Sequence, residues 1–137
     1  MDVLILIGRI LFVLLFLSSG YGHFAQAGPM SGYAKAKGVP MAKAAVLISG
    51  AMMLLGAVSV LLGIWPDLGA LLLVLFLIPA AFLMHGFWRE KDAQARQMES
   101  IQFFKDLSLA GASLMLFGLF TQLGDELGLV LVGPLFG

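Results

Sequence analysis

The feature that most constrains this chain is an apolar run over Leu68–Trp88, which reads LGALLLVLFLIPAAFLMHGFW. It is about as long as the ~20 residues with which a helix crosses the hydrocarbon core of a bilayer. A continuous helix would place His85 and Trp88 on one face, because residues three apart are neighbours. The most charged segment, Arg89–Asp92, follows directly. The run therefore predicts a membrane helix that ends at a water boundary, with a histidine just inside it.

Composition extends this prediction to the whole chain. Of its 137 residues, 61% are hydrophobic and 12% are charged, whereas soluble domains are about 45–50% apolar and about 25% charged. We therefore expect an all-α polytopic membrane protein whose main partner is the lipid bilayer. The net charge of zero, without a basic stripe, argues against nucleic acid as a partner. The chain has no cysteine, which excludes disulfides, thiolate-bound metals and a thiol nucleophile.

The hydrophobic pattern predicts one domain, residues 1–137, with four transmembrane helices. They cover about residues 3–22, 41–63, 68–88 and 101–121, and a tail follows over 122–137. Asp2 stands where a signal peptide carries basic residues, so we interpret the first segment as a retained helix. The tail is too short to span a bilayer, and we expect it to lie at the surface or to pack across the bundle.

Two longer connections separate these helices. Residues 25–40 are rich in glycine, with a turn signal at Gly28-Pro29, and residues 89–100 are hydrophilic. We expect both to be loops with at most a short surface helix. Seven of the eight Lys and Arg residues lie in or beside these loops. By the positive-inside rule, the loops face the cytoplasm and both termini face outward.

Helix 41–63 carries small residues at Gly50, Gly56 and Gly63. Small side chains let a neighbouring helix approach closely. We interpret the stripe first as packing within the chain. The alternative is an interface with another membrane protein.

The predicted topology gathers four ionisable side chains near the cytoplasmic ends of the helices: His23, His85, Lys105 and Asp106. Such groups are costly in a membrane and usually face the bundle interior. A histidine–carboxylate pair could hold a quinone carbonyl or pass a proton, since histidine titrates near neutral pH. We therefore take these four residues as the candidate site, with His85, Trp88 and Gln102 as candidate contacts to a quinone or lipid. The alternative is a polar plug that fixes helix register.

Arg9 is the one basic residue in the first predicted helix. A buried arginine must find a partner or reach the interface. Asp67, Asp125 and Glu126 are expected at the same end of the bundle, so we predict a structural ion pair with one of them. The alternative is a site for an anion or a lipid headgroup. The two histidines, far apart and without cysteine, have no metal-site spacing, so no metal is expected.

Four segments in register give the chain a family resemblance. They are GRILFVLLFLSSGYGHF in the first helix, Gly38-Val39-Pro40, LMHGFW, and IQFFKDLSLAGASLML. Together they resemble the DoxX family of small membrane proteins. Asp106 stands where that family more often has asparagine, and the tail lacks the usual Gly-Pro-Gly ending. The resemblance implies a four-helix bacterial inner-membrane protein, and some relatives form part of a thiosulfate:quinone oxidoreductase or of oxidative-stress complexes.

Two hypotheses from different classes follow. In the first, the chain is a membrane subunit of a redox complex with a quinone-proximal or proton-handling site, and a partner supplies the electrons. In the second, it is a non-enzymatic accessory protein that packs against a larger assembly through the Gly56 stripe and the apolar tail, or it forms a homo-oligomer. No cofactor is expected to be intrinsic to the chain; a quinone is the one candidate. A small-solute transporter is a more distant third, since four helices would need oligomerisation to form a central pathway.

Overall fold

The computed structural model describes residues 1–137, and the chain is helical with no β-strand. Four helices are long and apolar enough to cross a membrane. They are α1 (Asp2–Ala25), α3 (Ala42–Leu62), α4 (Pro66–Met84) and α5 (Ala93–Leu123). A shorter helix, α2 (Ala27–Ala36), and two 3-10 turns, η1 (Phe87–Arg89) and η2 (Gly124–Glu126), complete the chain. The predicted all-α architecture with four membrane helices is confirmed.

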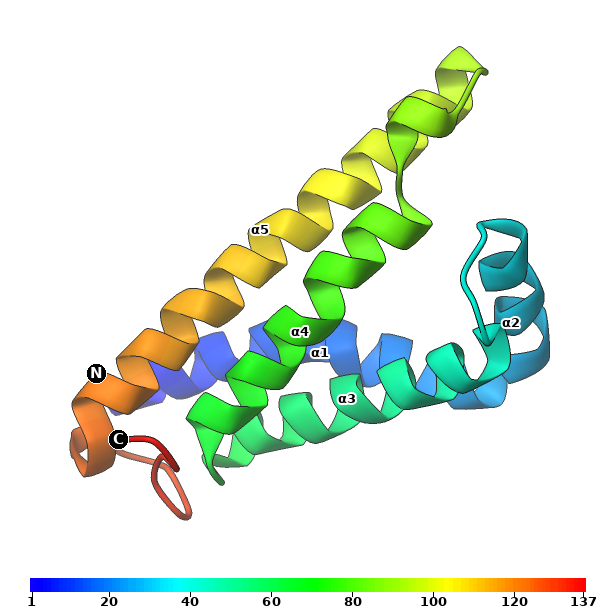
Figure 1. The fold of residues 1–137 in the computed structure, drawn as a ribbon. Helices are drawn as coiled ribbons and strands as arrows, with labels where there is room; N and C mark the ends of the chain where they lie inside the picture. Colours follow the sequence, from blue (N-terminus) through cyan, green and yellow to red (C-terminus); the bar gives the residue numbers. More distant parts are fainter.

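The membrane helices form two pairs, α1 with α3 and α4 with α5, which contact each other mainly through α3 and α4. The pairs meet at the end that holds both chain termini and diverge toward the end that holds α2 and η1 (Figure 1). We call the first the terminal end and the second, which includes α2 and residues 85–92, the loop end. This divergence leaves room for a cavity at the loop end.

Glycines allow the close contacts at the centre of the bundle. A Cβ atom added at Gly50 would lie 2.7 Å from the Cβ of His23 in α1, and one added at Gly56 would lie 2.9 Å from the carbonyl oxygen of Gly69 in α4. The small-residue stripe of α3 therefore packs within the chain, as the first interpretation predicted. The interpretation of Gly56 as a partner interface is wrong, because α4 already covers it.

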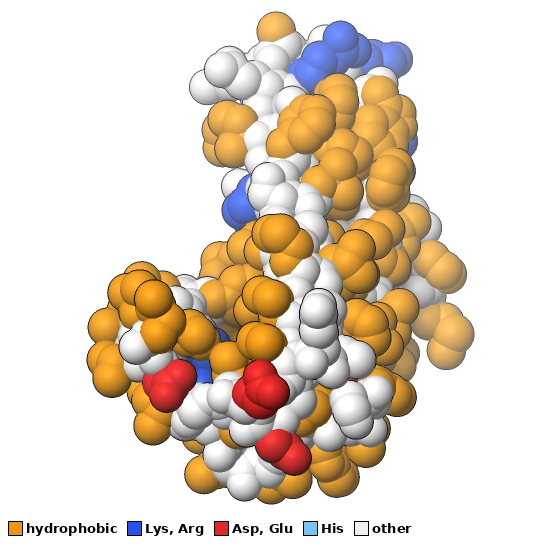
Figure 2. All heavy atoms as spheres, turned by 90° about the vertical axis from the view of Figure 1, so that its left-hand side faces the viewer, with side chains coloured by type: hydrophobic (Ala, Val, Ile, Leu, Met, Phe, Trp, Pro, Cys, Tyr) orange, Lys and Arg blue, Asp and Glu red, His pale blue; other side chains and the backbone are white.

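The outer surface of the bundle is apolar. Large side chains such as Leu4, Leu11 and Met115 are more than 60% exposed. Figure 2 shows hydrophobic side chains over most of the visible face, with the largest group of Lys and Arg at the loop end and Asp and Glu grouped at the terminal end. Such a surface is stable in lipid and would associate in water.

The connector over residues 25–40 was expected to be mostly loop, but it contains the helix α2. Its turn signal, Gly28-Pro29, lies within the first turn of that helix. The first four N–H groups of a helix have no partner inside the helix, so a proline there costs no hydrogen bond. Gly28-Pro29 therefore marks the start of a helix rather than a turn between helices.

Helix α4 ends at Met84, four residues before the predicted end. Gly86 follows, and the Nη2 atom of Arg89 donates to the carbonyls of Phe82 and Leu83 at 3.1 and 2.9 Å. The guanidinium thus replaces the amides of a further helical turn at the C-terminal carbonyls. The prediction that His85 and Trp88 share one face of a continuous helix is therefore wrong.

Helix α5 begins at Ala93, eight residues before the predicted start. Asp92 caps it by accepting a hydrogen bond from the backbone N–H of Ala95 at 2.9 Å. At about 1.5 Å per residue, its 31 residues extend about 46 Å. This exceeds the ~30 Å hydrocarbon core, so the first turns of α5 emerge from it. Their polar composition led to the prediction of a loop.

The C-terminal tail packs across the ends of α3 and α4. The N–H groups of Leu131 and Val132 donate to the carbonyls of Leu62 and Gly63 at 3.1 and 2.9 Å. The side chain of Leu127 joins the hydrophobic core. Of the two positions expected for the tail, the structure shows packing across the bundle.

Candidate functional site

A cavity of about 710 Å³ lies between the two helix pairs at the loop end. It is lined by 26 residues, 17 of them hydrophobic, from all four membrane helices and from α2. This size and lining are typical of a small-molecule site, which is mostly apolar with a few polar groups that orient the ligand. The polar groups of this cavity come from both walls.

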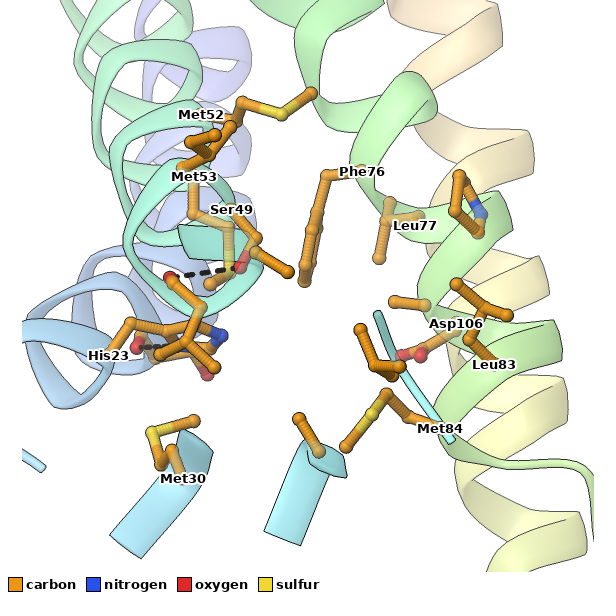
Figure 3. A pocket seen from close by; sticks show the side chains of 18 of the residues that line it. His23, Met30, Ser49, Met52, Met53, Phe76, Leu77, Leu83, Met84 and Asp106 are labelled. Atoms are coloured by element: carbon orange, nitrogen blue, oxygen red, sulfur yellow. Dashed lines mark hydrogen bonds between the residues drawn. The ribbon is translucent and has the colours of Figure 1, made fainter. Parts of the chain in front are cut away.

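Figure 3 shows the two walls. His23, Ser49, Met52 and Met53 lie on the side of the α1–α3 pair, and Leu77, Leu83, Met84 and Asp106 lie on the side of the α4–α5 pair. All four residues of the predicted candidate site line this cavity: His23, His85, Lys105 and Asp106. Residues from α1, from α5 and from the end of α4 thus line one cavity.

His85 sits at the C-terminal end of α4 between two carboxylates of α5. Its Nδ1 atom donates to Oε2 of Glu99 at 2.7 Å, and its Nε2 atom lies 3.8 Å from Oδ2 of Asp106. The bond to Glu99 holds the proton on Nδ1 and leaves Nε2 on the side of Asp106. In neutral His85 this Nε2 can accept a hydrogen bond, and in the protonated form it can donate one.

Asp106 is only 7% exposed, yet it accepts no hydrogen bond from the protein. Its nearest ionic neighbours are His85 at 3.8 Å and Nζ of Lys105 at 4.0 Å. A buried carboxylate is normally hydrogen-bonded. Asp106 therefore presents an unused acceptor to the cavity.

Lys105 and Gln102 form a local pair at the surface of α5. Nζ of Lys105 donates to the side-chain oxygen of Gln102, and the lysine side chain is 41% exposed. Lys105 lines the cavity but Gln102 does not. Gln102 is therefore not a contact within this cavity, because its side-chain oxygen accepts from Lys105, and its prediction as a lipid contact stays untested.

Trp88 also lies outside the cavity lining. It is 48% exposed and packs in an aromatic cluster with the rings of Phe82, Phe87 and Phe103, whose centroids lie 5.2 to 6.0 Å away. The early end of α4 causes this, because η1 turns Trp88 away from His85. Trp88 is therefore not a contact within this cavity, and its prediction as a lipid contact stays untested.

His23 faces the cavity from the opposite wall. Its Nδ1 atom donates to the carbonyl of Ser19 one turn earlier at 2.7 Å, and its ring packs edge-on against Phe76 at a centroid distance of 6.3 Å. The other nitrogen, Nε2, makes no hydrogen bond to the protein. His23 does not join the His85–Asp106 pair, and it offers a second polar contact across the cavity.

The structure adds residues that the sequence interpretation missed. The Oε1 atom of Glu99 accepts hydrogen bonds from Tyr33 and Lys37 at 3.1 and 3.2 Å, and Lys37 also donates to Glu90 at 3.1 Å. Glu99 was placed in the solvated stretch 89–100. A helix begun at Asp92 would have placed Glu99 and Asp106, two turns apart, on one face.

The two side chains that donate to Glu99 have shifted pKa values. Burial alone would lower the pKa of Lys37, but hydrogen bonds to Glu90 and Glu99 outweigh it and raise this pKa above its ordinary value. Burial raises the pKa of Tyr33, and the hydrogen bond to Glu99 and the charge of that carboxylate add to the shift. Both side chains therefore keep their protons well above neutral pH.

At the terminal end, Arg9 is only 2% exposed and donates to three backbone carbonyls. These belong to Val60 at 2.9 Å, Leu61 at 2.5 Å and Leu129 at 2.9 Å. The predicted ion pair is wrong. Asp67 accepts from the amides of Leu68, Leu135 and Phe136 instead, and neither Asp125 nor Glu126 forms an ion pair. Open carbonyls at the end of α3 attract the guanidinium more closely than any carboxylate does.

No group of three or more His, Asp or Glu side chains has an arrangement that could hold a metal ion. The polar groups of the cavity are suited to hydrogen bonding and proton exchange. They occupy one end of an otherwise apolar space.

Comparison with known proteins places the chain in a family. The DoxX family profile matches residues 4–86. The chain is 31% identical to the inner membrane protein YphA of Escherichia coli (strain K12) over 114 residues, which cover 83% of this chain and 81% of YphA. It is 30% identical to the inner membrane protein YqjF of the same organism over 117 residues, 84% of this chain and 82% of YqjF.

No solved structure is significantly similar to the chain. The two named relatives are inner membrane proteins, and the four apolar helices of this chain agree with that location. The profile covers all of α2, α3 and α4 and α1 from its third residue, including His23 and His85. The chain belongs to the DoxX family and is a multi-pass inner membrane protein.

Proposed function

We propose that this chain is the quinone-binding membrane subunit of a larger redox assembly. The observation that carries the proposal is the carboxylate of Asp106, buried and without a hydrogen-bond donor, beside His85 at the polar end of the cavity. A quinone combines an apolar tail with a ring that bears two polar oxygens. That combination matches an apolar cavity with a few polar groups.

The side chains have distinct roles in this proposal. Protonated His85 donates from Nε2 to a quinone carbonyl, and a quinol hydroxyl donates to Asp106. His23, on the opposite wall, contacts the second ring oxygen through its free Nε2. Glu99 orients His85 through the 2.7 Å hydrogen bond to Nδ1.

Reduction of a quinone to a quinol takes two electrons and two protons. The chain has no cysteine and no metal-binding cluster of His, Asp and Glu, so a partner subunit supplies the electrons. The protons come through the His85–Asp106 pair. The positive-inside rule predicts that the loop end faces the cytoplasm, which would then be the source of these protons.

Binding by the purified chain in lipid nanodiscs tests the proposal. Titration with decylubiquinone and with its quinol should show saturable binding. Asp106→Asn should weaken quinol binding about tenfold and quinone binding less, because a hydrogen bond to a charged group contributes roughly 1.5–3 kcal/mol. His85→Ala should weaken both.

Lys91→Ala is the matched control, since Lys91 is exposed and lies outside the cavity. Equal affinity in all four proteins would contradict the proposal. In the assembled complex, His85→Ala and Asp106→Asn should lower quinone-linked turnover while the complex stays intact. Normal turnover in both variants would contradict the redox role and favour the purely structural alternative.

A further inference from the structure

Helix α2 covers the cavity at the loop end. Met30, Tyr33 and Ala34 of this helix, and Val39 just after it, belong to the cavity lining. With 10 residues, α2 is too short to span a membrane. It packs mainly against α3 and, to a smaller extent, α1. Its connection to the other helix pair depends on side chains.

Two side chains make that connection. Tyr33 donates to Oε1 of Glu99 at 3.1 Å, and Nζ of Lys37 lies 3.2 Å from the same oxygen and 3.1 Å from Oε1 of Glu90. We call Tyr33, Lys37, Glu90 and Glu99 the latch. Its four members belong to the α2 region on one side and to the segment from η1 to α5 on the other.

The backbone on both sides of α2 departs from helical geometry. Gln26, between α1 and α2, has φ −117° and ψ 31°. Between α2 and α3, Gly38 has φ +85° and Met41 has φ +49°. Hinges are commonly a few residues at the ends of elements. Helix α2 is therefore bounded by two short connections about which it can turn.

We propose that α2 is a lid over the cavity, which the latch holds closed. Breaking the latch lets α2 turn away from the α4–α5 pair and opens the cavity to the water at the loop end. Glu99 belongs to both the latch and the site, because its second oxygen, Oε2, holds His85. The proposal of a lid depends only on the cavity and the latch contacts. It holds whether the ligand is a quinone or another molecule.

The absence of cysteine allows a direct test. Ser49→Cys places one thiol on the cavity wall (Figure 3). The rate of its reaction with a charged, membrane-impermeant methanethiosulfonate is measured in nanodiscs. Lys37→Met and Tyr33→Phe, each added to Ser49→Cys, should raise this rate roughly three- to tenfold, as expected for partly exposed ionic contacts of modest strength.

Two controls separate lid opening from general loosening. Lys35→Met removes a lysine of the same helix that forms no ion pair, and it should leave the rate unchanged. A cysteine at Ser113, which is fully buried in the bundle, should stay unreactive in the latch variants. The proposal is overturned if Lys37→Met reacts no faster than Lys35→Met, or if reactivity rises equally at position 113.

Discussion

Replacing Arg9 by methionine should strongly destabilise the bundle without touching the cavity. The guanidinium joins three segments, because it donates from α1 to the carbonyls of Val60 and Leu61 at the end of α3 and of Leu129 in the tail. Methionine has similar apolar bulk and no donor. Three carbonyls would lose their charged donor, Arg9, which is itself only 2% exposed.

The expected loss follows from these three hydrogen bonds. Hydrogen bonds between membrane helices contribute on average about 0.6 kcal/mol each, with an upper value of about 1.7 kcal/mol. Three of them therefore stabilise the fold by roughly 2–5 kcal/mol. A charged donor favours the upper part of this range. The tail should also loosen, because Leu129 is one of the three acceptors.

Steric trapping in bicelles measures the free energy of unfolding of such variants. Arg96→Met is the control, because Arg96 is exposed and donates only to the carbonyl of Glu90 at 3.2 and 3.3 Å; its cost should stay below about 0.5 kcal/mol. A double-mutant cycle of Arg9→Met with Glu126→Gln should give a coupling below about 0.5 kcal/mol. A cost for Arg9→Met no larger than for Arg96→Met, or a coupling above about 1 kcal/mol, would refute this account.

Three further predictions follow from the same structure. Asp67→Asn should speed amide hydrogen exchange at Leu135 and Phe136, both of which donate to this carboxylate; unchanged exchange would show that the tail is held elsewhere. Gly56→Leu should cost roughly 1–3 kcal/mol of stability, since even a Cβ would lie 2.9 Å from the carbonyl of Gly69; a stable variant that only loses a partner would restore the interface interpretation. Because the folded-state pKa of Lys37 is raised above 10.5, the stability it contributes is fully present below that pH and is lost as the pH rises through the folded pKa. The unfolding temperature of the wild-type chain should therefore fall in alkaline buffers. The Lys37→Met variant should lack this part of the pH dependence.

The sequence predicted the four membrane helices because each needs only a long apolar segment. It predicted their ends less well, for local reasons. Helix α5 begins in a polar stretch, where an amphipathic pattern is weak and Asp92 as a helix cap was the available signal. Helix α4 ends early because Arg89, five residues beyond Met84, folds back onto its last carbonyls. Such contacts depend on the three-dimensional position of the arginine side chain, which the amino-acid composition does not show.

The candidate site was predicted in outline. His23, His85, Lys105 and Asp106 line one cavity because each lies near the loop end of its helix, and a topology of four spans is enough to bring those ends together. Glu99 was missed because it follows a stretch, residues 89–98, in which seven of ten positions are polar or charged, and this composition indicates a solvent-exposed segment. The partner of Arg9 was also mispredicted. Charge alone predicts that an arginine pairs with a carboxylate. In the structure, the carbonyls of Val60 and Leu61 at the end of α3 accept hydrogen bonds from Arg9 instead.

The central claim is that the cavity holds a quinone at its polar end, and native mass spectrometry tests it most directly. The chain would be extracted from its own membranes in mild detergent, beside a Ser49→Trp variant whose indole would project into the cavity and obstruct it. The account predicts one bound quinone per wild-type chain and none in a folded variant. Lipid alone on the wild-type chain, or equal quinone on both proteins, would contradict it.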